Sequence, residues 1–160
     1  MQQSDSFLQE HTFYPFARGS LVSSTASQFS TAVEATDGTT LTLVESVTLN
    51  PGGIGALEEA KFYLTASFKS DSSAKAMNIQ WDAKSTDSTV WVNLAEATQG
   101  DATTTYLEYT VHGYKGPVDN LQKVPINVRC RFHGEDATCH SDCRTKNSSY
   151  VTLKWRPGVQ

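Results

Sequence analysis

Five cysteine and histidine side chains are concentrated in one short stretch of the chain: Cys130, His133, Cys139, His140 and Cys143. Structural zinc prefers thiolate and imidazole ligands, and a gap of two residues lets neighbouring side chains bind the same ion. A hairpin turning at 134–136 would bring the two halves of this cysteine–histidine cluster together. The spacing makes Cys130, His133, Cys139 and Cys143 candidate ligands of a structural zinc ion.

Strand geometry and the odd number of cysteines keep other states of this cluster open. Cys130 and His133 are three residues apart, so a straight strand would place them on opposite sides unless it ended or bulged near Phe132. Cys139 and Cys143 can instead form a local disulfide that leaves Cys130 as a buried thiol, or Cys130 can pair with either of them. All three can also stay reduced. A disulfide among the cysteines is favoured over zinc, and no other cofactor is expected.

The sequence contains no recognisable catalytic arrangement. Nothing positions a cysteine thiolate beside an orienting base and oxyanion donors. The glycine-rich segment Gly52–Gly55 lacks the lysine and the following helix of a phosphate-binding loop. Carboxylates are scattered along the chain, so no glycosidase pair can be assigned. We therefore predict that the protein is not an enzyme.

Length and charge narrow the classes of partner. The chain has 160 residues and a formal net charge of -4, which fits one domain and disfavours a nucleic-acid partner. No apolar run approaches the roughly 20 residues that cross a bilayer, so no membrane partner is expected. The segment Met1–Ser6 lacks the basic and apolar regions of a signal peptide. The default expectation is a cytoplasmic protein.

Alternating apolar and polar residues are clearest between Ala60 and Leu94. Phe62, Leu64 and Phe68 share one phase of the alternation and Tyr63 the other, which is the pattern of a strand with one buried face. The same period marks further strands near 39–49, 77–83, 90–94, 106–114, 124–133 and 150–155, with a weaker one at 21–33. Turn signals rich in glycine, proline and serine separate them.

These segments predict an all-β protein of about eight strands, folded as a single antiparallel β-sandwich with jelly-roll or Ig-like topology. Residues 1–20 are expected to form an irregular N-terminal arm and residues 21–160 the β-sandwich domain. Residues 56–59 are expected to form one helical turn, and 95–105 a loop. Glu45 interrupts an apolar strand face, which indicates a bulge or a sheet edge.

Aromatic side chains outside the predicted core are the candidate partner-binding residues. Phe13, Tyr14 and Phe16 lie in the arm, which can dock along its own sandwich or reach onto a neighbouring subunit, where such side chains make good anchors. Trp91 has the opposite phase from Val90, so it is either an exposed platform or a residue covered by the arm or a second sheet.

At the level of its class, the chain resembles small β-sandwich accessory proteins of virions, such as bacteriophage capsid decoration and fibre-head proteins. The resemblance rests on the aromatic arm Phe13-Tyr14-Pro15-Phe16, on the serine- and threonine-rich sandwich exemplified by 101–106, and on the absence of an export signal. It implies a location in the virion, which leaves the cell by assembly and lysis. It assigns no residue roles.

Two functions follow as expectations. The first is a non-enzymatic virion structural protein, a capsid decoration or appendage subunit, that binds a capsid or other copies of itself as a homo-oligomer. The second is a carbohydrate-binding β-sandwich module that stacks a glycan on Trp91, Tyr63 or Tyr106.

Overall fold

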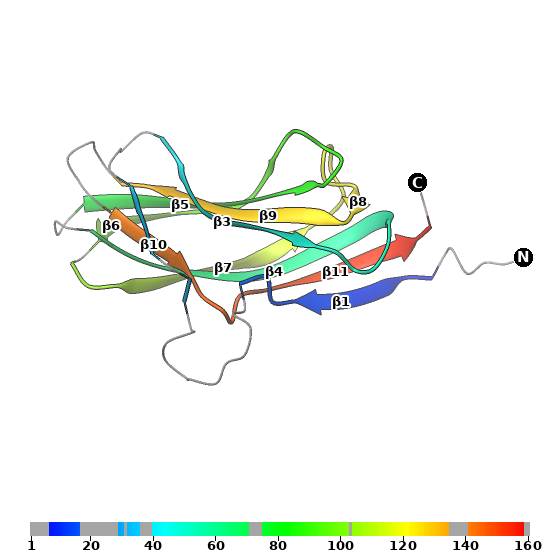
Figure 1. The fold of residues 1–160 in the computed structure, drawn as a ribbon, viewed down its shortest axis with the longest axis horizontal. Helices are drawn as coiled ribbons and strands as arrows, with labels where there is room; N and C mark the ends of the chain where they lie inside the picture. The colour runs from blue at the N-terminus through cyan, green and yellow to red at the C-terminus, as the bar shows by residue number, and fades with distance from the viewer. Residues whose placement is uncertain are drawn as a thin grey trace, which may run out of the picture.

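The computed structural model describes residues 7–16, 29–30, 32–35, 40–70, 75–102, 104–134 and 141–158, and all their regular structure is β-strand. In chain order the strands are β1 (Gln9–Phe13), β2 (Val33–Ala35), β3 (Thr42–Leu49), β4 (Gly55–Ser70), β5 (Lys75–Ser85), β6 (Val92–Ala102), β7 (Leu107–Lys115), β8 (Lys123–Val124), β9 (Ile126–His133), β10 (Ser141–Thr145) and β11 (Tyr150–Pro157). They form two facing sheets, which Figure 1 shows as an upper and a lower layer. The prediction of an all-β fold is confirmed.

The long strand β4 lies in the middle of the first sheet. One of its edges pairs with β11 over residues 55–63 and with β10 over 66–70, and the other pairs with β8 and β7. β1 extends the sheet beyond β11, and β2 extends it beyond β10. The first sheet is therefore four strands wide, and three of its positions are each shared by two strands: β1 with β2, β11 with β10, and β8 with β7. The second sheet has the order β3-β9-β5-β6.

The connections between the sheets identify the topology as a jelly roll. The chain passes from β3 in the second sheet to β4 in the first and returns to β5 and β6 in the second. It then crosses to β7 and β8 in the first sheet, to β9 in the second, and back to β10 in the first. Eight strand positions in two four-stranded sheets, joined by such crossings, are the jelly-roll arrangement, whereas Ig folds place seven to nine strands in unequal sheets. Of the two predicted topologies, the connectivity matches the jelly roll.

The predicted alternation along β4 decides what is buried. Leu64, Ala66 and Phe68 are buried, while Lys61 and Tyr63 point out of the sandwich. From the second sheet, Ile79, Trp81, Val128 and Phe132 complete the core. A strand exposes its side chains to alternate faces, so this single register fixes both the core and the outer face of the first sheet.

Three local predictions have a clear outcome. The helical turn at 56–59 is wrong, because these residues belong to β4, where the pairing with β11 is irregular between Lys154 and Trp155. The loop at 95–105 is also wrong over 95–102, which continues β6 to Ala102. The bulge signalled by Glu45 is confirmed, since the register of β3 against β9 shifts between Leu43 and Glu45.

Part of the predicted arm belongs to the sandwich itself. β1 pairs with β11 from Gln9 to Phe13, and Figure 1 shows the two strands side by side. Phe13 packs against the core, and Phe16 is fully buried, with its ring centroid 5.6 Å from that of Trp81. Residues 17–20 of the arm and most of the weak strand at 21–33 lie outside the described residues. Over 9–16, the segment docks on its own chain.

Replacing Phe16 by alanine should lower the free energy of unfolding by about 3 kcal/mol, because it leaves a cavity beside Trp81. Denaturant titration followed by tryptophan fluorescence would measure the loss. Tyr14→Ala is the matched control, since Tyr14 is 57% exposed and its loss should cost much less. Equal stability of the Phe16→Ala variant and the parent chain would show that residues 14–16 are not part of the folding core.

Candidate interaction surface

Five of the six tyrosines of the chain lie on the outer face of the first sheet: Tyr14, Tyr63, Tyr106, Tyr114 and Tyr150. We call these residues the tyrosine face. Strand parity places Tyr63, Tyr114 and Tyr150 there, because the residues beside them in β4, β7 and β11 point inward. Tyr14 and Tyr106 lie just outside strands and are placed by their contacts with Tyr150 and Arg144. The sixth, Tyr109, packs against the core. The outer side of this sheet therefore carries most of the amphipathic aromatic surface of the protein.

Four rings of this face form a line across the strands, which we call the aromatic row: Tyr14, Tyr150, Tyr63 and His112. Tyr150 and Tyr63 are cross-strand partners with parallel rings, 5.5 Å apart and inclined by 5°. Tyr14 lies 6.3 Å from Tyr150, and His112 lies 6.3 Å from Tyr63. Tyr63 and Tyr150 therefore each turn one ring face toward the other, while Tyr63 stays 41% exposed.

A hollow opens beside the aromatic row. It has a volume of about 190 Å³ and is lined by Lys61, Phe62, Tyr63, His112, Gly113, Tyr114 and Tyr150. We call it the aromatic hollow. Tyr114 is 65% exposed and lies within 5.8 Å of the Lys61 ammonium, measured to the ring centroid. The hollow combines an apolar lining with a cation at its rim.

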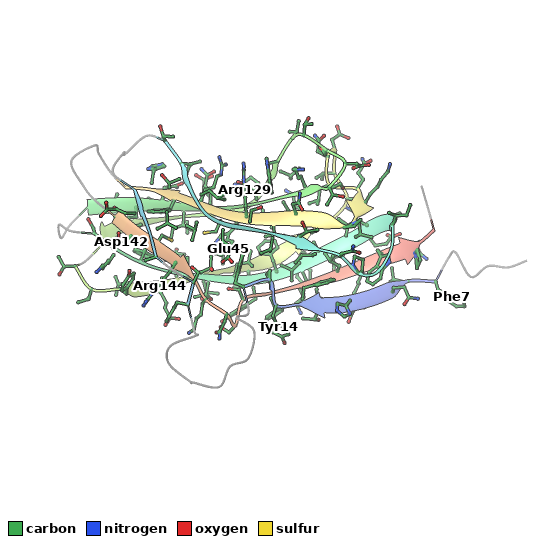
Figure 2. All side chains as sticks on the ribbon, viewed as in Figure 1. Phe7, Tyr14, Glu45, Arg129, Asp142 and Arg144 are labelled. Carbon is green, nitrogen blue, oxygen red and sulfur yellow. The ribbon has the colours of Figure 1, made fainter. Side chains whose placement is uncertain are left out.

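The far end of the tyrosine face is held by an arginine between two rings. The Arg144 guanidinium lies 3.7 Å from the Tyr106 ring centroid and 3.9 Å from that of Phe29, while its Nε donates to Ser67. Burial raises the pKa of Tyr106, and the negative charge of Asp142 adds to this shift. Arg144 thereby fixes the segment at Phe29 and the start of β7 to the sheet. Figure 2 shows Tyr14 and Arg144 along the lower layer, with Arg129 on the upper one.

The outer face of the second sheet has a different chemistry. Asp82, whose side chain is only 4% exposed, accepts hydrogen bonds from Arg129 Nε and Arg131 Nε, each at 3.0 Å. The half-buried Trp91 covers this charge cluster, with the Arg129 guanidinium 4.0 Å from its ring centroid. Further along the sheet, polar side chains bond one another, for example Asn78 and Gln80 to Glu96. These polar groups bond one another within the face, except that the buried Asn78 Oδ1 has no hydrogen-bond partner among the described residues.

The structure separates the predicted zinc ligands. Cys130 is buried in the core, whereas His133 lies on the opposite side of β9, with its Nδ1 2.7 Å from the Gly134 carbonyl oxygen. Cys143, on β10, is buried and forms a sulfur hydrogen bond with Cys130. Both are free thiols. Cys139 lies outside the described residues, so a zinc site or a disulfide that includes it stays a prediction.

The predicted partner-binding residues are likewise divided. Phe13 and Phe16 face the core, Tyr14 lies at one end of the aromatic row, and Trp91 has one ring face occupied by Arg129. Tyr114, His112 and Tyr150 were not among the binding residues predicted from the sequence. Their outward phase was readable, because residues beside them alternate as core positions. The alternation within each strand does not show that β11, β4 and β7 lie side by side in the sheet.

Comparison with known proteins yields a likeness of fold alone. No protein-family model and no curated protein matches the chain. Among solved structures it is similar to a chain of infectious bursal disease virus, Gx strain, with a TM-score of 0.52 and 9% identity over 95% of this chain. Chains from the T13 particle and the Gt strain of that virus give TM-scores of 0.41, at 11% and 12% identity, over 91% and 90% of this chain and 41% and 37% of theirs.

The present chain spans 33% of the length of the Gx strain chain. The likeness extends along nearly all of this chain but to only part of the viral one. It supports the jelly-roll assignment, which the connectivity of the strands already gives. In the part of the chain that the structure describes, no helix has the length and apolar character needed to cross a membrane.

Replacing Asp82 by asparagine should destabilise the fold by about 2 kcal/mol, because two guanidinium groups lose their carboxylate. The loss is smaller than the roughly 3–5 kcal/mol of a fully buried pair, since both arginines keep some contact with water. Chemical denaturation would measure it. Asp87→Asn is the control, since Asp87 forms only an exposed contact with Lys123, 3.6 Å away, and should change stability little.

The two core thiols should be unreactive in the folded protein. Burial raises the pKa of Cys130, and its hydrogen bond to Cys143 adds to the shift, so the reactive thiolate is disfavoured. In a Cys139→Ser background, we expect no reaction with Ellman's reagent until guanidinium unfolds the chain, and then two reactive thiols. Absence of thiols after unfolding without reductant would instead show a disulfide between Cys130 and Cys143.

The same thiol makes stability depend on pH in a defined direction. The pKa of Cys130 is higher in the folded chain than in the unfolded one. The thiol's contribution to the free energy of unfolding is therefore fully present below the unfolded pKa of about 8.5. The free energy of unfolding should fall as the pH rises above that value. A Cys130→Ala variant should show a shallower fall over the same range, measured by denaturant titration at a series of pH values.

Proposed function

We propose that the chain is a non-enzymatic structural protein of a virus particle, a capsid decoration or appendage subunit that binds its neighbours through the tyrosine face. The jelly roll is a common fold of viral capsid domains, and the likeness to a viral chain agrees with this assignment. Because the same fold also occurs in lectins and enzymes, fold alone does not decide the function. Its location would be the virion.

The concentration of tyrosines on one face is the observation that carries the proposal. Tyrosine is enriched at the centres of protein interfaces, because it offers a large rigid contact area and a hydroxyl group at low cost in conformational entropy. Tyr14, Tyr63 and Tyr114 remain exposed here. A contiguous patch of exposed aromatic side chains on a soluble domain typically marks a binding surface.

Two ion pairs on the tyrosine face lower the electrostatic cost of covering it with a protein partner. Lys146 Nζ lies 2.6 Å from Glu108 Oε1, and Lys154 Nζ lies 3.7 Å from Glu10 Oε2. Pairs that are already neutralised within a face can be covered with less electrostatic penalty than isolated charges. The face therefore suits a capsid protein or another copy of this chain better than a strongly charged partner.

Carbohydrate binding is the second candidate, and one observation favours it. The ring of Tyr114 is exposed between the aromatic hollow and a more polar hollow of about 210 Å³ that is lined in part by Glu10, Glu59 and Lys154. An aromatic ring beside polar groups is suited to stacking on a sugar. Against it, Tyr63 and Tyr150 each turn one ring face toward the other rather than toward a ligand.

Replacing Tyr63 and Tyr150 together by serine should weaken self-association or binding to capsid particles by at least about tenfold, if the aromatic row is at the interface. Sedimentation velocity of the isolated chain and co-sedimentation with capsids from the virus that encodes it would measure this. Leu43→Ser is the matched control, an exposed apolar residue on the second sheet. Circular dichroism and thermal unfolding would establish that each variant is folded.

Two outcomes would contradict the proposal. A parent chain that stays monomeric at high concentration and binds no capsid would exclude the structural role. Specific binding to an oligosaccharide array, abolished by Tyr114→Ala and accompanied by no protein association, would favour the second candidate.

A further inference from the structure

Two apolar features of the first sheet lack a partner among the described residues. Phe7 and Leu8, just before β1, are 63% and 49% exposed. The aromatic hollow beside Tyr114 is open on the same sheet. We propose that Phe7 and Leu8 of one copy of the chain insert into the aromatic hollow of a second copy. This inference rests on the proposed function, because it names the partner as the chain itself and identifies the contact.

The hollow has a suitable size and lining for the proposed occupant. A cavity of roughly 150 Å³ lined by apolar side chains is large enough for benzene, and the aromatic hollow measures about 190 Å³. Tyr63, Tyr114 and Tyr150 contribute aromatic rings from the outer face to its lining, whereas the side chain of Phe62 belongs to the core. A phenyl ring placed there would make edge-to-face or offset contacts, the arrangements that aromatic pairs prefer. Phe7 is thus the anchor, and Leu8 adds apolar contact beside it.

Charges next to the two features are complementary. The hollow is lined in part by Lys61, and among the described residues no carboxylate lies within ion-pair distance of its ammonium, since Glu10 and Glu59 pair with Lys154. The inserting segment is followed by Glu10, whose side chain is 59% exposed and lies 3.7 Å from Lys154. Glu10 of one copy would reach Lys61 of the next by leaving or sharing its contact with Lys154. Such pairing would orient the segment more than it would strengthen binding.

The fold keeps the segment away from the hollow of its own chain. β1 and β7 lie at opposite edges of the sheet, with β11 and β4 between them. Tyr150 lines the hollow from β11, and Gln9 pairs with Trp155, five residues further along that strand, so the start of β1 lies roughly 17 Å from Tyr150 along the sheet, at about 3.4 Å per residue. In Figure 2, Phe7 projects beyond the end of β1, away from the body of the sandwich. The segment is available to another molecule.

This contact would join two different surfaces, one convex and one concave. Each copy would then keep one unused segment and one unused hollow, so association would continue head to tail. Such a heterologous contact produces a closed ring or an open array, depending on the rotation between successive copies. Either outcome provides repeated subunits of the kind that a particle or an appendage needs.

Complementation between two defective variants provides a sharp test. Phe7→Ser combined with Leu8→Ser removes the segment and keeps the hollow, whereas Tyr114→Ala removes a wall of the hollow and keeps the segment. Each variant alone should associate at least about tenfold more weakly than the parent chain in sedimentation velocity. An equimolar mixture of the two should form a one-to-one pair that grows no further, because only one productive contact remains.

The matched control is Ile54→Ser, which replaces an apolar residue of similar exposure, 54%, in the loop between β3 and β4. It should associate like the parent chain. If the parent associates but both variants do so equally well, or their mixture forms no pair, the inference is overturned while the structural role survives. If the parent neither associates nor binds capsids, both fail. Thermal unfolding of each variant separates lost contact from lost folding.

Discussion

The alternation of side chains along β4 is the constraint on which the rest of the structure depends. This strand runs from Gly55 to Ser70 and pairs with strands on both of its edges. Its inward residues meet the second sheet, and its outward residues define the middle of the tyrosine face. A slip of one residue would move Phe62 and Leu64 into water and Tyr63 into the core. The same register therefore specifies the fold and the candidate interaction surface together.

The two outer faces differ in what their aromatic side chains contact. On the second sheet, Trp91 covers the Asp82–Arg129 pair, so the largest side chain of that face is used to shield charges of its own chain. On the first sheet, the tyrosine rings contact mainly one another and leave Tyr14 and Tyr114 exposed. The exposed tyrosines of the described chain, Tyr14, Tyr63 and Tyr114, all lie on the first face, whereas Trp91 on the second face is half-buried.

Local sequence pattern predicted the strands whose inner residues are large and apolar, and it missed the others for physical reasons. β10 buries Ser141, Cys143 and Thr145, which are too small or polar to produce a hydrophobic alternation. β6 lies at a sheet edge and has a largely polar sequence, so the pattern over 95–102 predicts a loop. The aromatic row joins residues up to 136 positions apart, from Tyr14 to Tyr150, and depends on strand order. Sequence spacing alone carries no information about that order.

A surface of this kind suits weak contacts between subunits. Such contacts become effective when many copies are held together in one assembly. A single aromatic hollow of about 190 Å³ can hold one anchoring side chain, which alone gives modest affinity. When many copies are held in one array, each further contact forms at high effective concentration, and the assembly becomes far more stable than any one pair. Isolated subunits with weak contacts also avoid premature aggregation, which a larger apolar patch would promote. A small domain with one aromatic face and one face of mutually bonded polar side chains meets both requirements.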